Sequence, residues 1–431
     1  MPAVPLRQID VNREPPRSEA LTEDQVRLSV KNGLHSTRCI DIHTHLYPPA
    51  FGKLGLWGID ELLTYHYLEA EFFRSSPMSY DEYWSLTKKQ RADAIWRTLF
   101  VENTPISEAT RGVIFVLNAF NLPTDSTDLT VARRFFREQT IDRHVDQVLR
   151  MSGVSTVVMT NDPLDPEEAP MWMNSGDTTA TFRSVIRLDR LVREWSEPWQ
   201  ELHKQGYQVV NRASAKSIKE IRRFLAEWRE RMQPVYMAVS LPDSFHFPDG
   251  SVRGMIFREA VLPACREFNL PLSLMIGVRR QVNPKIRLAG DGVGRADLKS
   301  VETICRDFPE NKFFVSVLSR ENQHELCVLA RKFNNLLPFG CWWFLNNPSI
   351  VKEITRERIE MLGMSFIPQH SDARVLEQLI YKWHNTRRTL EQVLTHSYQL
   401  LVADGRVVTA LDIQNDLGRL FHSNFERWIG N

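Results

Sequence analysis

Short apolar runs alternate with amphipathic stretches along the chain from residue 154 onward. The apolar runs have the length of buried strands, and the stretches between them repeat apolar positions at helical spacing. The clearest predicted helices cover 215–232 and 322–333. The predicted strands cover 154–159, 182–186, 235–239, 272–276, 313–318, 337–343 and 365–368.

A further strand is predicted ahead of these, in the apolar and partly β-branched segment 38–46, which contains His43 and His45 near its end. Alternate side chains of a strand leave from the same face, so the two imidazoles project together. Two neutral imidazoles on one side of a strand end can bind the same divalent cation. The alternative interpretation is a pair of surface histidines in a loop.

The alternation of strand and helix predicts an α/β architecture. Strands joined through helices run parallel, and eight such units favour closure into a (β/α)8 TIM barrel. Segment 50–150 has helical periodicity and is far longer than a crossover requires, so we expect a helical subdomain inserted after strand 1. The chain then divides into a Pro- and charge-rich N-terminal arm (1–36), a barrel with C-terminal helices (37–49 and 151–431) and the insertion.

Composition and charge exclude several classes of function. Hydrophobic residues make up 42% and charged residues 25% of the 431 positions, which is globular composition, and the net charge of +1 gives no field that would favour nucleic acid. No apolar stretch reaches the roughly 18 residues of a membrane span. The five cysteines are scattered without C-x-x-C spacing, and no secretory signal is readable, so we expect reduced thiols in a cytoplasmic protein.

The aromatic residues of the insertion bear on assembly. Segment 50–150 contains many tryptophans, tyrosines and phenylalanines. If some of them are exposed, they fit a homo-oligomer, which we expect. A buried face of the same subdomain explains them equally well.

Chemistry-bearing residues stand where the predicted strands end, which is where barrels place their active sites. Strands 1 and 8 are neighbours in a closed barrel, so Asp372, after strand 8, can share one metal ion with His43 and His45. Arg374 alternates with Asp372 and can face the same pocket. His370 lies on that face too and is a minor alternative ligand.

Two other strand ends offer candidates for substrate binding. Arg187 follows strand 3, and its guanidinium could bind a carboxylate in bidentate fashion or pair internally with Asp189. Trp342 and Trp343 follow strand 7. Adjacent strand residues face opposite ways, so only one tryptophan is expected to line a pocket, while the other fills the core.

Six short segments, in the same order along the chain, match the motifs of one enzyme family. The family motifs are D-x-H-x-H-L, D-H-Y, T-D-D-P-x-D, F-R-P-D, G-x-W-W-F and T-D-S-R. The matching segments are 41–46 (DIHTHL), 64–67 (TYHY), 160–165 (TNDPLD), 186–189 (IRLD), 340–344 (GCWWF) and 371–374 (SDAR). From residue 39 onward, the chain thus resembles the uronate isomerases, the glucuronate isomerases of the amidohydrolase superfamily.

The resemblance implies an amidohydrolase-type barrel and an aldose–ketose isomerisation. The substrate would be an aldohexuronate such as D-glucuronate or D-galacturonate, and the product its ketohexuronate, formed by proton transfer through an enediolate. Asp372 would ligate the metal and shuttle a proton, and His66 and Tyr67 would act as acid and base. Arg187, Arg374 and Trp342 would bind the sugar acid.

Two departures from the family pattern concern the site itself. Met275 stands where the family has the His of L-H-I-G, and Tyr65 replaces the Asp of D-H-Y. A thioether is a poor ligand for zinc or manganese, so Met275 removes a possible histidine from the surroundings of the metal. We expect one divalent ion, zinc with manganese as the alternative, on His43, His45 and Asp372.

Other functions remain open from the sequence. The departure at Met275 leaves room for a divergent hydrolase or lyase of the superfamily that acts on a related carboxylated sugar or lactone. A relative that binds sugar acids without turning them over is a third possibility. His66 could also be a surface residue of the insertion.

Overall fold

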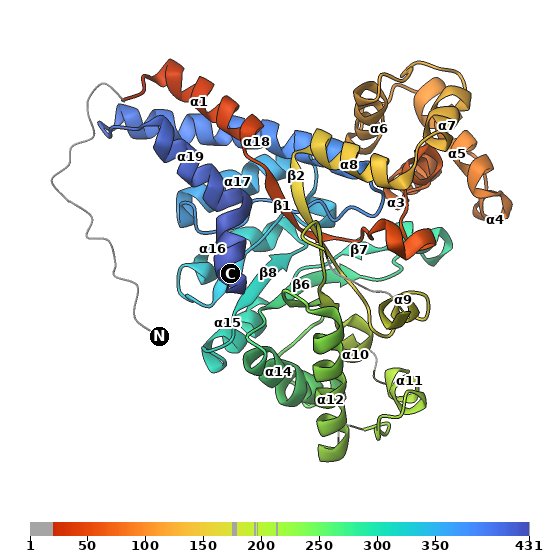
Figure 1. Cartoon of the computed structure of the whole chain (residues 1–431), viewed down its shortest axis with the longest axis vertical. Helices are drawn as coiled ribbons and strands as arrows, with labels where there is room; N and C mark the ends of the chain where they lie inside the picture. Colours follow the sequence, from red (N-terminus) through yellow and green to blue (C-terminus); the bar gives the residue numbers. More distant parts are fainter. Residues whose placement is uncertain (1–19, 175–178, 194, 196, 213, 431) are drawn as a thin grey trace.

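Parallel strands form the centre of the computed structural model, which describes residues 20–174, 179–193, 195, 197–212 and 214–430 (Figure 1). One sheet contains β1 (Cys39–Thr44), β2 (Val154–Met159) and β3 (Phe182–Arg183), in that order. The other has the order β4–β5–β6–β8–β9, and the short strand β7 pairs antiparallel with the C-terminal end of β6. These strands are β4 (Ile186–Arg187), β5 (Met237–Pro242), β6 (Leu272–Arg279), β7 (Gly292–Val293), β8 (Phe313–Val317) and β9 (Leu336–Pro338).

The predicted α/β class is confirmed, but the described residues form two parallel sheets rather than one closed sheet. The predicted strand 182–186 is split between β3 and β4, because Phe182 and Arg183 pair with β2, whereas from Ser184 onward the chain also pairs with the segment that leads into β5. The predicted strand 337–343 ends early, at Pro338, since Gly340 adopts a left-handed φ of 64°. The predicted strand 365–368 contributes a single bridge, between Ile367 and Phe339.

Isolated backbone contacts connect the two sheets. Asn161, just after β2, forms a parallel bridge with Ile186 of β4. At the other side, the Asp372 N–H donates to the His43 carbonyl at 3.1 Å, and the His45 N–H donates to the Ala373 carbonyl at 2.7 Å. The segment after the Ile367 bridge therefore lies beside β1, as expected for the first and last strands of the sequence pattern.

Helices follow the strands in alternation, and the amphipathic stretch 215–232 forms α12 (Ala215–Met232) within its predicted bounds. Its apolar face is buried, and Ser214 caps its first turn. The other helices that follow β2 are α9 (Ala169–Asn174), α10 (Asp189–Arg193), α11 (Pro198–Lys204), α13 (Val252–Ile256), α14 (Leu262–Glu267), α15 (Leu298–Asp307), α16 (Gln323–Ala330), α17 (Pro348–Leu362), α18 (Gln378–Ala403), α19 (Ala410–Gly418) and α20 (Asn424–Ile429).

The long segment between β1 and β2 is helical, as its periodicity predicts. Figure 1 shows α4 to α7 grouped at one side of the molecule, away from the strands. The last helix stops at Gly153, whose left-handed φ of 69° lets the chain turn into β2. The helices are α2 (Ile59–Leu63), α3 (His66–Ser75), α4 (Tyr80–Ser85), α5 (Lys88–Trp96), α6 (Glu108–Ala119), α7 (Thr130–Arg137) and α8 (Ile141–Ser152).

The described part of segment 1–36 contains α1 (Glu23–Ser36), which begins at a Thr22 capping box. Val26, Val30 and Leu34 are buried on one face of α1, which packs against α18 and α19 (Figure 1). Residues 1–19 lie outside the described part, so the domain boundaries stay a prediction. No helix in the described ranges is long and apolar enough to cross a membrane.

The cysteines behave as the sequence predicts. All five are free thiols, and all are buried. Burial raises the pKa of the Cys39 and Cys265 thiols far above the ordinary value, so these groups stay protonated. They fill the core and offer no thiolate to a metal ion.

Candidate active site

Three ligand-type side chains meet where β1 ends. The Nε2 atoms of His43 and His45 lie 3.6 and 3.2 Å from Oδ1 of Asp372. One ligand atom from each of the three residues lies within 4.8 Å of the others, which is the spacing of a metal site. The residues that the sequence predicts as ligands, more than 300 positions apart, are therefore brought together.

The carboxylate of Asp372 is held in place by backbone contacts around it. Asp372 adopts a left-handed φ of 50°, a conformation that Asp and Asn tolerate better than other residues with a side chain. On its N-terminal side, the Ser371 N–H donates to Oδ1 of Asp41 at 3.0 Å, and Lys382 Nζ donates to the Ser371 carbonyl at 2.6 Å. Trp383 Nε1 donates to the other oxygen of Asp41 at 2.8 Å.

Sequence reasoning assigned no role to these supporting residues. Asp41 belongs to the D-x-H-x-H-L motif, and its position there was the one available signal. Lys382 and Trp383 lie on α18, and nothing in their local pattern separates them from other residues of an amphipathic helix. Only the packing of α18 beneath segment 371–375 reveals what they contact.

Burial sets the protonation of the histidines. Desolvation lowers the pKa of His43 to about 3 and that of His45 to about 4, so both imidazoles are neutral at pH 7 and keep a lone pair for a cation. Burial also acts to raise the pKa of Asp372, but the interactions with His45 and His43, which favour the carboxylate when the imidazoles are protonated at low pH, outweigh it, and the pKa lies well below its ordinary value. The cluster therefore presents two neutral nitrogen donors and one anionic oxygen donor.

A hydrogen-bond chain fixes the tautomer of His45. The Thr160 hydroxyl donates to the Thr44 carbonyl at 2.8 Å, which uses its one hydrogen. Its oxygen lies 3.0 Å from Nδ1 of His45 and must accept a proton from that nitrogen. The proton therefore sits on Nδ1, and Nε2 turns its lone pair toward Asp372, as a metal-ligating histidine does.

The donor set fits a divalent cation. Among the described residues, no group donates a hydrogen bond to the buried Oδ1 of Asp372, and Nδ1 of His43 has no partner either. An unpaired buried carboxylate oxygen is costly unless a cation compensates it. His370 lies close by, with its ring centroid 5.0 Å from that of His43, but it is outside the group of three.

A narrow pocket surrounds the triad. His66, Arg187, Trp342 and Arg374, which the sequence predicts at the site, all contribute to its lining. Tyr67 does not contribute among the described residues; it packs behind His66, with ring centroids 4.6 Å apart. The other lining residues are Thr160, Asp189, Ala238, Ser240, Met275, Arg280 and Trp343.

Both tryptophans line the pocket, so the expectation that only one would do so is wrong. That expectation assumed a strand through Trp342 and Trp343. The strand β9 ends earlier, and Trp343 begins the 3-10 helix η7 (Trp343–Leu345) with a left-handed φ of 46°. The rule that alternate side chains face opposite ways does not apply to that backbone.

Arg187 pairs with Asp189 and also reaches the pocket. Its Nη2 donates to Oδ2 of Asp189 at 2.7 Å, and Oδ1 of the same carboxylate accepts from the Ser240 N–H at 2.8 Å. The internal ion pair considered from the sequence is therefore present. The ion pair orients the guanidinium. Because this planar group donates to Asp189 along one edge, the N–H groups of its other edge stay available to a ligand.

Arg280 is the lining residue that strand-end reasoning missed. The predicted strand stopped at residue 276, whereas β6 continues to Arg279 and delivers Arg280 to the rim. Its guanidinium is paired with Asp291 and lies 5.9 Å from the ring centroid of Trp343. The free volume of the pocket is about 20 Å³, enough for an ion or a water molecule. A larger ligand requires rim side chains such as Arg280 to move.

Comparisons with known proteins place the chain in a family. A scan of protein-family models and a search of curated proteins each found no match. Among solved structures, a uronate isomerase from Bacillus halodurans C-125 is 48% identical in sequence, with a TM-score of 0.93 over 95% of this chain and 97% of that chain.

Two more distant structures share the fold. A uronate isomerase from Thermotoga maritima is 17% identical, with a TM-score of 0.76 over 95% of this chain and 99% of that one. A glucuronate isomerase from Caulobacter crescentus is 14% identical, with a TM-score of 0.75 over 94% of each chain. The resemblance in the short motifs thus extends over almost the whole length, and the chain belongs to the uronate isomerase family.

Proposed function

We propose that the protein interconverts an aldohexuronate of the D-glucuronate or D-galacturonate type and the corresponding ketohexuronate. The observation that carries the proposal is the triad of His43, His45 and Asp372 in one pocket with Arg187 and Arg374, in a member of the uronate isomerase family. Isomerisation moves a proton between adjacent carbons through an enediolate. It needs a base near those carbons and positive charge near the developing oxyanion.

The residues of the pocket suit these tasks. Arg187 and Arg374 supply guanidinium groups that would bind the carboxylate and hydroxyl groups of the sugar acid. Burial holds the pKa of His66 well below its ordinary value, and its buried Nε2 has no partner within the described part of the chain. A neutral His66 at the lining can accept the substrate proton, and Asp372 is the alternative acceptor. Trp342 and Trp343 would exclude water from the enediolate.

Tyr67 has a lesser part in this scheme than the family resemblance implies. Burial raises the pKa of its phenol well above the ordinary value, so the group stays neutral. Its buried hydroxyl, next to His66, has no hydrogen-bond partner in the ranges that the structure describes. We propose that it orients His66 rather than exchanging a proton with the sugar.

We propose zinc, or manganese in its place, as the ion held by His43, His45 and Asp372. When bound, the ion supplies positive charge that polarises a sugar carbonyl or hydroxyl oxygen. Two neutral nitrogens and one carboxylate suit both metals. We further propose that the eight strand segments make up an amidohydrolase-type barrel. The isolated contacts at Asn161, Ile367 and Asp372, which link the two sheets, support this arrangement.

The experiment that tests the proposed function is an NMR assay of purified, zinc-loaded protein with D-glucuronate and D-galacturonate in deuterium oxide. The expected result is conversion to the ketose with exchange at the carbon next to the carbonyl. Removing the metal with a chelator should abolish the conversion, and zinc or manganese should restore it. Absence of turnover for either uronate would contradict the proposal.

A hydrolase or lyase acting on a related carboxylated sugar or lactone is the second candidate. Met275 at the pocket lining favours it, because the departure from the family motif lies at the site. Products formed in 18O-labelled water separate the two activities. Hydrolysis adds the elements of water and leaves solvent 18O in a carboxylate or hydroxyl group, and a lyase releases a group and gives a lighter product. Isomerisation keeps the molecular formula and can take up 18O only at the carbonyl group, which exchanges with water.

Replacing Met275 by histidine is expected to increase the affinity of the site for zinc. Met275→His places an imidazole in the lining beside the triad and is expected to tighten zinc binding at least about tenfold, since histidine is a far better zinc ligand than a thioether. Competition with a chromophoric chelator measures the affinity. Met275→Leu conserves size and should leave the affinity unchanged. Equal affinities of the two variants would place residue 275 out of reach of the ion.

Removing the guanidinium group of Arg374 is expected to weaken substrate binding. Among the described residues its guanidinium has no hydrogen-bond partner, so Arg374→Met costs the fold little. Losing a charged contact to the substrate carboxylate is expected to raise KM for D-glucuronate by about tenfold or more, with a smaller change in kcat. Steady-state kinetics measures both. An unchanged KM would exclude Arg374 from carboxylate binding.

A further inference from the structure

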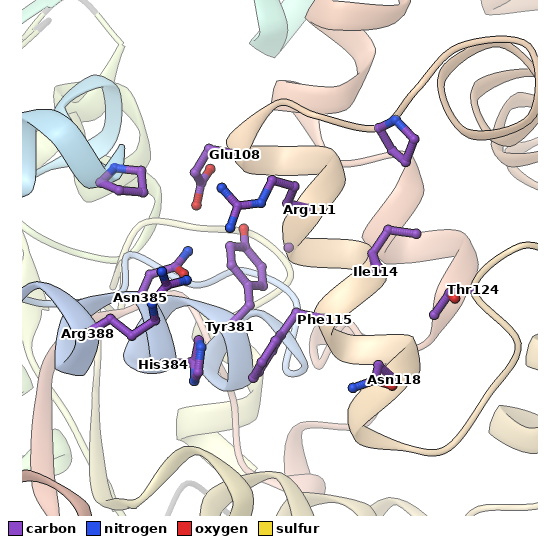
Figure 2. A pocket seen from close by; sticks show the side chains of 13 residues that line it. Glu108, Arg111, Ile114, Phe115, Asn118, Thr124, Tyr381, His384, Asn385 and Arg388 are labelled. Carbon is purple, nitrogen blue, oxygen red and sulfur yellow. The ribbon is translucent and has the colours of Figure 1, made fainter. Parts of the chain in front are cut away.

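A separate cavity of about 470 Å³ lies between α6 and α18. It shares no lining residue with the pocket around the triad. Figure 2 shows Arg111 of α6 and Tyr381, Asn385 and Arg388 of α18 turned toward the same space. The α18 residues recur at helical spacing and so form one face. The volume is within the range of small-molecule sites.

The cavity carries an excess of positive charge. Of the described residues, two guanidinium groups, of Arg111 and Arg388, line it, together with a single carboxylate, that of Glu108. Within the described ranges neither arginine side chain forms an ion pair or a hydrogen bond. An adjoining hollow shares both arginines and adds Lys352. Guanidinium groups that converge on a concave surface and outnumber its carboxylates are suited to an anion.

Three rings, of Phe115, Tyr381 and His384, belong to the lining of the cavity. The rings of Phe115 and His384 stack with centroids 4.1 Å apart and an interplanar angle of 27°. Burial lowers the pKa of His384, which keeps the stacked imidazole neutral. The Tyr381 ring is buried against Gly112, where an added Cβ would lie 2.8 Å from it, so α6 and α18 pack closely at this point. Aromatic rings in the lining suit the carbon skeleton of an organic ligand.

We propose that this cavity binds a small organic anion with a phosphate or carboxylate group. Arg111 and Arg388 would bind the anionic group, because guanidinium matches both phosphate and carboxylate in bidentate fashion. Phe115 and His384 would contact the carbon skeleton, and Asn385 would offer its amide to a hydroxyl group. The proposal does not depend on the isomerase activity, since the two pockets have no lining residue in common.

Helix α18 connects the cavity with the triad. Lys382, next to Tyr381 on α18, donates to the Ser371 carbonyl beside the metal ligand Asp372. One face of α18 therefore supports the metal-binding segment, and another lines the cavity.

Isothermal titration calorimetry of the metal-loaded protein at low ionic strength tests the proposal. The probes are D-glucose 6-phosphate, succinate and neutral D-glucose. We expect at least one anion to bind, with D-glucose showing no heat. The double variant Arg111→Ala/Arg388→Ala should weaken that binding at least about tenfold. Arg406→Ala removes an exposed arginine outside the cavity and should leave the affinity unchanged.

Each outcome separates the possibilities. Binding of the phosphate ester alone assigns the site to phosphates, and binding of succinate alone assigns it to carboxylates. Glu108→Gln removes the carboxylate from the lining and is expected to tighten anion binding several-fold, a gain that a misfolded variant would not give. Absence of binding by both anions overturns the proposal, as does binding that the double arginine variant leaves unchanged, since the anion then binds elsewhere.

Discussion

Asp372→Asn is expected to reduce turnover of the uronate by about a thousandfold, equivalent to about 4 kcal/mol of activation free energy. The substitution keeps the shape of the side chain, and Asn tolerates the left-handed backbone at this position as Asp does. It removes the single anionic donor of the triad, so a bound cation would face three neutral ligands. Zinc affinity should therefore fall together with turnover.

The measurements are kinetics at saturating zinc and a direct zinc titration of the metal-free variant. Asp404→Asn is the matched control, because Asp404 is exposed beyond the end of α18 and lies outside the pocket lining. If Asp372→Asn kept the affinity and the turnover of the unsubstituted protein, the ion would have to bind away from the residues at the end of β1.

Gly340→Ala is expected to destabilise the protein and weaken its metal site together. Gly340 has a left-handed φ of 64°, and an added Cβ would lie 2.0 Å from Cδ2 of His370. His370 is fully buried between His43 and Phe339 and cannot retreat. The left-handed backbone costs about 1–2 kcal/mol for a residue with a side chain. Overpacking a filled core adds about 1–3 kcal/mol.

Urea unfolding measures the free energy of unfolding. A zinc titration shows whether a displaced His370 in turn displaces the ligand His43. Gly363→Ala is the matched control. Gly363 has a similar φ of 58°, but no atom lies within 4 Å of the added Cβ. Gly363→Ala should lower the free energy of unfolding only by the backbone strain, and it should leave zinc binding intact. If Gly340→Ala left the zinc affinity as intact as Gly363→Ala does, the contact with His370 would not reach the metal site.

The sequence determined the elements and the chemistry. The helix at 215–232 and the strand at 154–159 lie within their predicted bounds, because the periodicity of apolar residues is a local property of the chain. The two histidines of β1 and the carboxylate of Asp372 could be paired from sequence, because the order of parallel strands implies which strand ends are neighbours. The family followed from short motifs.

Tertiary structure decided what depends on packing between distant segments. The split of strand 182–186 and the early end of β9 follow from a change of pairing partner at Ser184 and from the backbone at Gly340, and neither changes the hydrophobic pattern. Lys382 supports Ser371 only because α18 lies beneath that segment. The cavity between α6 and α18 likewise joins residues far apart in sequence. Local periodicity fixes the type of each element, whereas its neighbours are fixed by the assembled core.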